Sequence, residues 1–297
     1  MSVGVQPASR SSMPAVNTKS TQSVATAVGA IFKEMFPRAK PIWQKRLFHD
    51  VDNAYRGEHP DYLPCDLHYH DLEHSLQAAL CYAFLIAGRH RAAVVPRVTP
   101  RQFELGLAAA LLHDVGYLKH RSDTAGTGAK YNYIHVLRSC TFAASYLPKL
   151  GIGLAEMQGV LGAINCTGPT SEVARMYFRD PTERMIGCAV ATADYLGQMA
   201  ATDYPDELPI LYAEFEESYN YTHVPVAQRT FQSVRQMTEE TPAFWSSVVL
   251  PKLDNSFQAL YRFLADPYPH GRNAYLEAVE HNIAVIKSRA APGRKKK

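Results

Sequence analysis

Apolar residues recur every three or four positions along most of the chain, which is the period of an α-helix that buries one face. The clearest stripe follows residue 70, where Leu72, Leu76, Leu80 and Phe84 share one face of the expected helix. The alternation of apolar and polar residues that is typical of half-buried strands is missing throughout the sequence. The pattern therefore predicts an all-α protein.

Proline and glycine residues separate the apolar stripes, and they predict where the helices end. We expect helices over about residues 24–50 (broken by Pro37 and Pro41), 70–90, 101–117, 131–148, 153–165, 182–199, 206–221, 225–248, 252–265 and 272–288. The predicted organisation is a disordered tail at 1–23, a helical core at 24–200, a C-terminal helical extension packed on it at 201–290, and a basic tail at 291–297. No internal repeat is apparent.

Composition is that of a globular protein with a sizeable core, since 46% of the 297 residues are hydrophobic. The net charge is only +3, and the last four residues, all basic, supply more than that. This balance does not favour a nucleic-acid-binding protein.

The five cysteines are odd in number, scattered and without a C-x-x-C pair, which favours reduced thiols and a cytoplasmic protein. No apolar run approaches the roughly 20 residues needed to cross a bilayer, so no membrane association is expected. Residues 1–33 contain no acidic residue and are rich in Ser and Thr. A transit peptide shares that composition, although the missing periodicity favours a disordered tail.

The segment LAAALLHDVGY, residues 107–117, places candidate chemistry in apolar surroundings. His113 and Asp114 lie at the C-terminal end of the predicted helix, about 100° apart around its axis, and both could reach an ion above that end. A buried, unpaired carboxylate is costly, so Asp114 needs a partner. A metal, an arginine or a helix terminus would each serve.

Eight of the twelve histidines fall between His59 and His135. His70 and His74 are four residues apart on one predicted helix, so both would project from the same face. That spacing suits a pair of metal ligands, and a solvated helix face produces it equally well.

Three separate motifs together resemble the HD superfamily of metal-dependent phosphohydrolases. They are the segment Tyr69-His70-Asp71-Leu72-Glu73-His74, the pair His113–Asp114, and Ala193–Asp194, each with its histidine or aspartate on its own predicted helix. The Tyr-His-x-x-x-His opening looks most like the branch that includes the cyclic-nucleotide phosphodiesterases. The segments ATADYLGQMA and NAYLEAVEHNI look like a bacterial group of HD-domain proteins. The resemblance covers about residues 65–285 and implies a phosphodiesterase-like helical bundle.

The resemblance also implies a catalytic centre. His74, His113, Asp114 and Asp194 would bind one divalent metal, and Asp114 could bridge to a second. Imidazole and carboxylate ligands do not choose among manganese, iron, zinc, nickel or magnesium. His70 would be a general acid that protonates the leaving oxygen, as an imidazole with an ordinary pKa of about 6.5 can do. The metal would lower the pKa of bound water to about 7.

The chain departs from the family pattern three residues after Asp114. Many members have a histidine there, whereas this chain has Tyr117, so a second metal would lack that ligand. His135 on the following helix is the best substitute ligand, and a partly buried helix histidine is the alternative.

Candidate substrate contacts surround these motifs. Lys119, His120 and Arg121 could contact a phosphate, and a solvated basic turn explains them equally well. Asn165 could hydrogen-bond a substrate or simply end its helix, and Gln198 could hold the Asp194 carboxylate or be exposed. A set of aromatic residues in the C-terminal part is more typical of core than of a base-stacking platform, but could line one side of a pocket: Tyr204, Tyr212, Phe215, Tyr219 and Tyr221.

The sequence therefore favours a metal-dependent phosphohydrolase that cleaves a small phosphomonoester or phosphodiester, such as a nucleotide. One alternative is an HD-type di-iron oxygenase, for which His135 is the lone additional histidine ligand. Another is a regulatory module without catalysis, against which the complete set of four metal ligands argues. A homodimer is compatible with the long helices, but nothing in the sequence specifies one.

Overall fold

The computed structural model describes residues 16–290 and contains ten α-helices within them. The helices are α1 (Thr21–Met35), α2 (Gln44–Tyr55), α3 (Leu72–Arg91), α4 (Pro100–Leu112), α5 (His135–Tyr146), α6 (Leu154–Cys166), α7 (Pro181–Met199), α8 (Tyr204–Tyr221), α9 (Val234–Phe244) and α10 (Ala274–Ala290). The all-α prediction is confirmed. Residues 16–290 contain a single pair of strands, of two residues each, with β1 (Ala265–Asp266) antiparallel to β2 (Arg272–Asn273).

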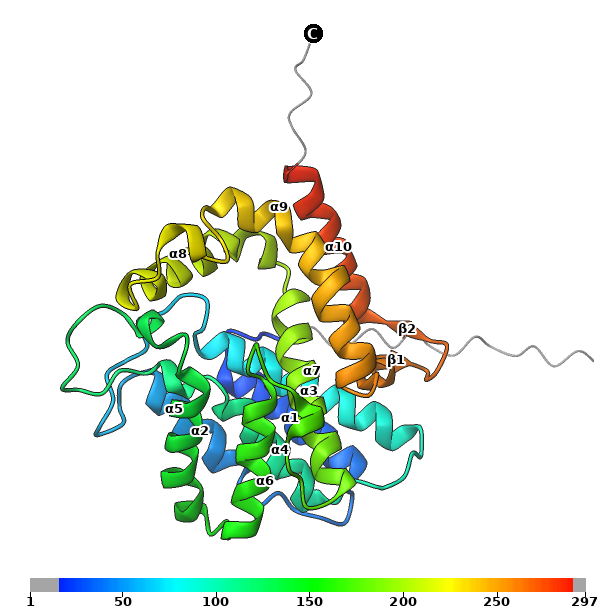
Figure 1. The fold of residues 1–297 in the computed structure, drawn as a ribbon. Coiled ribbons are helices and arrows are strands. Elements are labelled where there is room, and N and C mark those ends of the chain that lie inside the picture. Colours follow the sequence, from blue (N-terminus) through cyan, green and yellow to red (C-terminus); the bar gives the residue numbers. More distant parts are fainter. Residues whose placement is uncertain (1–15, 291–297) are drawn as a thin grey trace, which may run out of the picture.

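Helices α3 and α7 form the centre of the bundle, where they pack against each other (Figure 1). Both are buried on nearly every side, which explains why their apolar residues extend beyond a single stripe. Gly197 of α7 faces the backbone of Gln77 and Ala78 so closely that an added Cβ would come within 2.9 Å of it. This contact brings the C-terminal half of α7 against the first turns of α3.

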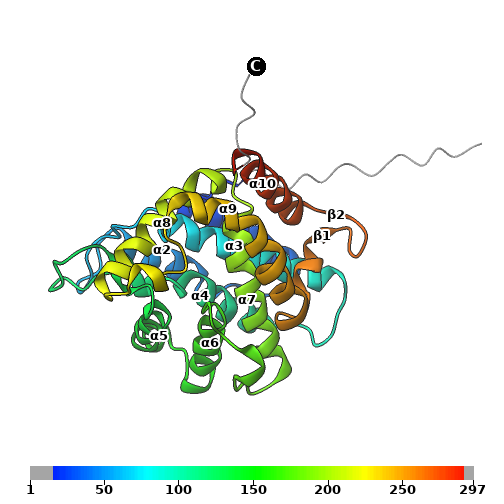
Figure 2. The same ribbon diagram turned by 45° about the horizontal axis from the view of Figure 1, so that its top comes forward.

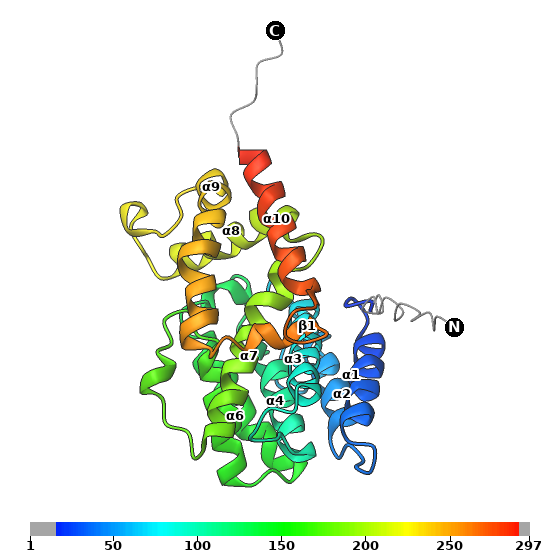
Figure 3. The same cartoon turned by 90° about the vertical axis from the view of Figure 1, so that its right-hand side faces the viewer.

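The other helices surround this pair. Helices α1 and α2 lie on one side of the bundle and α9 on the opposite side (Figure 3). Helices α5 and α6 lie at the end away from α10 (Figure 2), and α6 packs on both α4 and α7. Helix α10 packs on α7, α8 and α9. No helix within the described part of the chain is both long and apolar enough to cross a bilayer.

Local capping moves several helix ends away from their predicted positions. Asp71 caps α3 by accepting a hydrogen bond from the His74 main-chain nitrogen at 3.1 Å, so the helix begins at Leu72. His70 therefore precedes α3, and the prediction that His70 and His74 share a helix face is wrong. Ser20 caps α1, so this helix begins within the segment 1–23 that was predicted to be a disordered tail. Residues 1–15 of that segment and the predicted basic tail lie outside the described part of the chain.

The C-terminal half differs most from the predicted pattern. The single helix expected over residues 225–248 becomes a short turn (Val226–Gln228), an irregular segment, α9, and a π-helical turn (Trp245–Val249). A second π turn and a 3-10 turn, Lys252–Ser256 and Leu260–Leu264, replace the helix expected over 252–265. Pro242 and Pro251 fall in this region, and each removes a backbone donor that a regular helix would use.

Candidate active site

Four predicted ligands from three parts of the chain converge in the interior. His74 comes from the first turn of α3, His113 and Asp114 follow the end of α4, and Asp194 comes from α7. The Nε2 atoms of His74 and His113 lie 3.1 Å apart. The His74 Nε2 is 3.2 Å from Asp114 Oδ2 and 3.2 Å from Asp194 Oδ1, while the His113 Nε2 is 3.5 and 3.4 Å from the same oxygens. All four side chains are buried.

The orientation of the two imidazoles fits a cation. The Nδ1 of His113 lies 2.8 Å from the carbonyl oxygen of Ala110, which can only accept, so this nitrogen carries the proton and the Nε2 presents a lone pair to the group. The Nδ1 of His74 is buried without a hydrogen-bond partner, so the polar contacts of its ring are those of Nε2. Two imidazole nitrogens and two carboxylate oxygens are donors that divalent transition metals accept, and three of the side chains (His74, His113 and Asp114) form a compact group suited to one ion.

The protonation of this group supports the same interpretation. Burial by itself would lower the pKa of His74, but hydrogen bonds to Asp114 and Asp194 outweigh it and raise that pKa to about 10. Burial by itself would raise the pKa of Asp194, but His113 and His74 lower it to about 2. The carboxylates are therefore ionised and attract positive charge, which a metal would supply in place of protons.

A histidine–carboxylate pair lies beside this group, and its carboxylate was not predicted. The Nδ1 of His70 is 2.6 Å from Oε2 of Glu214 on α8. Oε1 of Glu214 also accepts the main-chain hydrogens of His68 and Tyr69, at 3.1 and 2.8 Å. Burial opposes ionisation of Glu214, but the bond from His70 outweighs it and lowers the pKa of this carboxyl. In sequence, Glu214 is one of several glutamates in AEFEESY, and nothing distinguishes it there.

Tyr117 occupies the space between two histidines. Its ring stacks on His70 with centroids 4.6 Å apart and on His135 with centroids 4.5 Å apart. The main chain reaches His135 closely because Gly116 has no Cβ, which would lie 2.0 Å from the His135 carbonyl oxygen. The aromatic ring thus fills the position at which the resemblance in the sequence led us to expect a histidine.

His135 approaches the group without joining it. Its Nε2 lies 3.7 Å from Asp114 Oδ1, while its Nδ1 donates to the Asn132 carbonyl at 2.6 Å. Burial lowers the pKa of His135, so the ring is neutral and its Nε2 presents a lone pair toward Asp114. The carboxylate oxygen that His135 approaches is Oδ1 of Asp114. That His135 is a metal ligand stays a proposal.

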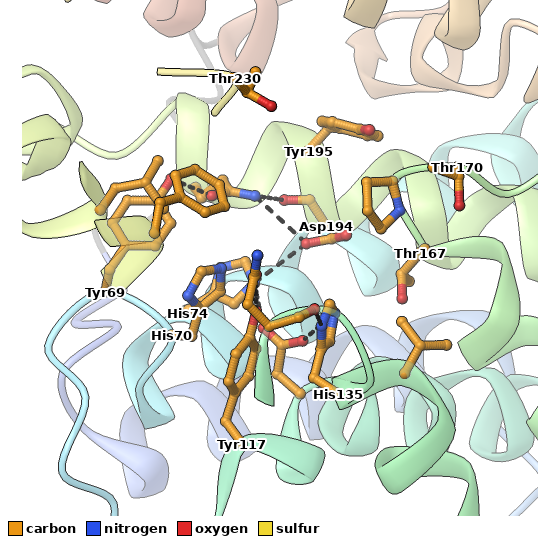
Figure 4. A pocket seen from close by; sticks show the side chains of 18 of the residues that line it. Tyr69, His70, His74, Tyr117, His135, Thr167, Thr170, Asp194, Tyr195 and Thr230 are labelled. Atoms are coloured by element: carbon orange, nitrogen blue, oxygen red, sulfur yellow. Dashed lines mark hydrogen bonds and ion pairs between the residues drawn. The ribbon is translucent and has the colours of Figure 1, made fainter. Parts of the chain in front are cut away.

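A cavity of about 700 Å³ opens onto these side chains. Figure 4 shows His70, His74, Tyr117 and His135 on one side of it and Thr230 on the opposite side. Among the predicted substrate contacts, Asn165 and Gln198 line it. Asn165 donates to the Leu161 carbonyl at 2.8 Å. Gln198 accepts from the Tyr69 hydroxyl and donates to Asp194 Oδ1 at 3.5 Å, so it touches this carboxylate as predicted from its helix position.

The predicted phosphate contacts lie elsewhere, outside the lining of this cavity. Lys119 forms an ion pair with Asp66 at 2.8 Å. Arg121 donates to the main-chain carbonyls of Pro60 and Gly57, at 2.8 and 2.6 Å. His120 is exposed and bonds Ser122. Lys119 and Arg121 thus fasten their loop to residues 57–66, and His120 is exposed outside the cavity, which corrects the expectation that the three residues contact substrate at this site.

No family model and no curated protein matches the chain. Among solved structures, it is similar to the phosphodiesterase domain of the RhoPDE fusion protein from the choanoflagellate Salpingoeca rosetta, with a TM-score of 0.59. The two chains are 14% identical, and the match covers 93% of each. At this identity the likeness concerns the fold, and the predicted phosphodiesterase-like all-α architecture is confirmed.

Proposed function

We propose that this protein is a metal-dependent hydrolase of phosphoesters with an HD-type centre. The observation that carries the proposal is the convergence of two imidazole Nε2 atoms and two carboxylate oxygens from α3, the end of α4 and α7. A divalent metal held by His74, His113, Asp114 and Asp194 would lower the pKa of water and neutralise charge on a phosphoryl oxygen.

The second component of the proposal is proton transfer by His70. In hydrolysis, the P–O bond to the leaving alcohol breaks, a P–O bond to water forms, and one proton must reach the leaving oxygen. Glu214 orients the His70 ring through Nδ1 and leaves Nε2 as the nitrogen that can exchange a proton. Because His70 lines the cavity beside the metal ligands, it is placed to protonate a leaving group there.

The arrangement around Tyr117 favours hydrolysis over di-iron oxygen chemistry. A second ion beside Asp114 would have Oδ1 of that residue and Nε2 of His135 as its nearest protein donors, and the Tyr117 ring stacks directly on His135. Di-iron sites in helical bundles use more ligands than this for the second ion.

The test combines metal analysis with turnover of bis(4-nitrophenyl) phosphate. Protein purified without chelator should contain a transition metal and release 4-nitrophenolate, and both should be lost on chelation and return when metal is added. His281→Ala, an exposed histidine of α10, should retain both properties. Oxygen uptake with bound iron and no phosphoester turnover would overturn the proposal in favour of the oxygenase alternative.

A further inference from the structure

We call His74, His113, Asp114 and Asp194 the metal group. The cavity has a second wall, which is apolar and is formed by other elements than those that carry the metal group. Helix α8 contributes Leu208, Leu211 and Phe215 at three- and four-residue spacing, and α9 contributes Met237 and Phe244. Helix α8 thus turns an apolar stripe toward the cavity, and on α9 Met237 and Phe244 flank Thr241, which also lines it. Exposed apolar surface gathered in a pocket is typical of a site that binds an apolar ligand.

Aromatic rings cluster at this wall. Phe215 lies between two other lining aromatics, with its centroid 6.1 Å from that of Phe231 and 6.3 Å from that of Tyr219. Phe244 is 38% exposed although it borders the cavity. Such large partly exposed rings would gain free energy by covering an apolar group.

Charge is as informative as apolarity. Within the part of the chain that the structure describes, the cavity lining contains no lysine or arginine, and its acidic residues are Asp114 and Asp194 of the metal group. Di- and triphosphates are bound in proteins largely by arginine and lysine side chains and helix N-termini. A lining without such cations fits a substrate with a single negative charge, which is the charge of a phosphodiester.

Three amide side chains of the lining, which could recognise a nucleobase, already form hydrogen bonds. Asn132 accepts from the Tyr117 hydroxyl at 2.8 Å, and Asn165 and Gln198 hold main-chain or carboxylate partners as described above. At the apolar wall, the Thr241 hydroxyl donates to the Met237 carbonyl at 2.7 Å. Reading a base edge through these bonded atoms would require the bonds to be given up.

We propose that the substrate is a phosphodiester in which the alcohol that is not released is a bulky alkyl chain, which lies against the wall formed by α8, Phe231 and α9. This inference rests on the proposed hydrolase function. The phosphoryl group would lie at the metal ligands and His70, and the apolar alcohol would extend toward Phe215 and Phe244. A nucleoside in that position would leave its polar base against apolar side chains, at a cost in desolvation.

The test is a series of substrates that share one leaving group. Methyl, butyl and hexyl 4-nitrophenyl phosphate carry the same charge, and the hexyl ester is used below its micelle concentration. Because each buried methylene group adds favourable transfer free energy, kcat/KM should rise by roughly tenfold or more from methyl to hexyl. The 4-nitrophenyl ester of thymidine 5′-phosphate, equal in charge but polar, should be cleaved less efficiently than the hexyl ester.

Alanine variants test whether the wall residues cause the rise of kcat/KM with alkyl chain length. Phe231→Ala and Phe244→Ala should each lower the hexyl-to-methyl ratio of kcat/KM by roughly threefold to tenfold. Tyr177→Ala, an aromatic residue that is 84% exposed and outside the cavity lining, is the matched control and should leave the ratio unchanged.

The outcomes separate this inference from the function on which it rests. If the methyl ester is cleaved but the series is flat, or the nucleoside ester is preferred, the inference is overturned and the hydrolase stands. If no ester is cleaved, the hydrolase fails, and calorimetry with hexylphosphonate and methylphosphonate decides the inference. Tighter binding of the hexyl compound with a negative heat-capacity change supports it, and equal binding overturns it.

Discussion

Two histidine–carboxylate groups lie side by side in this protein, and their geometries suit different chemistry. In the group of His74, His113, Asp114 and Asp194, the two imidazole Nε2 atoms lie 3.1 Å apart, and each is 3.2 to 3.5 Å from one oxygen of either carboxylate. In the pair of His70 and Glu214, the Nδ1 of the imidazole forms a hydrogen bond of 2.6 Å with Oε2 of the carboxylate. The first arrangement surrounds space for a cation, whereas the second fixes a ring and leaves a nitrogen for proton exchange.

The difference shows that residue type alone does not assign a role. His70, His74 and His113 all have carboxylate neighbours, and His70 and His74 both line the cavity. What distinguishes them is the number of donors that converge on one point and which ring nitrogen is already in use. Variants that affect one group and spare the other therefore test the distinction.

Asp114→Asn should produce the largest effect. A neutral amide is a weaker ligand than a carboxylate, and Asp114 faces both imidazoles, so the variant should lose its metal. Since a metal supplies several kcal/mol of transition-state stabilisation, kcat/KM for a phosphodiester should fall by about 10³-fold or more. Metal analysis and turnover measure this, with the exposed Asp61→Asn as control. Normal metal content with normal turnover in Asp114→Asn would remove this aspartate from the centre.

His70→Asn should retain the metal and lose general-acid catalysis. For an ester with an alkyl leaving group, which needs a proton, the rate should fall by roughly 10²- to 10⁴-fold. For a 4-nitrophenolate leaving group, which departs without one, the loss should be much smaller. Comparison of the two leaving groups at constant metal content measures the role. Equal losses for both, or loss of the metal, would contradict it.

Glu214→Gln should have a smaller effect of the same kind. Glutamine can still accept from His70 but without the charge, and a hydrogen bond to a charged group contributes about 1.5 to 3 kcal/mol. We expect roughly a tenfold to hundredfold loss for alkyl leaving groups, with the metal retained. Because Glu214 acts through His70, the double variant His70→Asn with Glu214→Gln should lose little more than His70→Asn alone. Fully additive losses would separate the two residues.

The smallest expected effect concerns stability in acid. The pKa of Glu214 is lowered in the folded protein, so its contribution is present above its ordinary pKa of 4.5 and is lost as the pH falls through the lower folded value. Glu214→Gln should therefore cost about 1 kcal/mol near pH 7 and less in acid, where the two proteins approach each other. Thermal unfolding between pH 7 and pH 3 measures this. A constant difference across that range would show that Glu214 is not ionised in the fold.

Helix periodicity and motif spacing were sufficient to predict much of this architecture. The stripes that begin at Leu72 and Pro181 correspond to α3 and α7, because a helix buried in a bundle must present apolar residues at three- and four-residue intervals. Errors arose where other local features outweighed periodicity, as at the Asp71 cap before α3 and at residues 225–233, which form only a short turn and an irregular segment before α9 begins at Val234.

The sequence by itself determined most of the helices and the short motifs, because these depend on residues close together in the chain or on spacing that a helix preserves. The resemblance of those motifs to the HD superfamily supplied the four candidate ligands. Only the tertiary structure placed Glu214 against His70, Tyr117 between two histidines, and the apolar residues of α8 and α9 across the cavity from the metal group. The tertiary structure also places Lys119 and Arg121 outside the site, where they contact Asp66 and the loop at 57–60. These contacts join residues up to 144 positions apart. The packing of whole helices decides these contacts, and the local sequence does not indicate which distant side chain will form a given hydrogen bond.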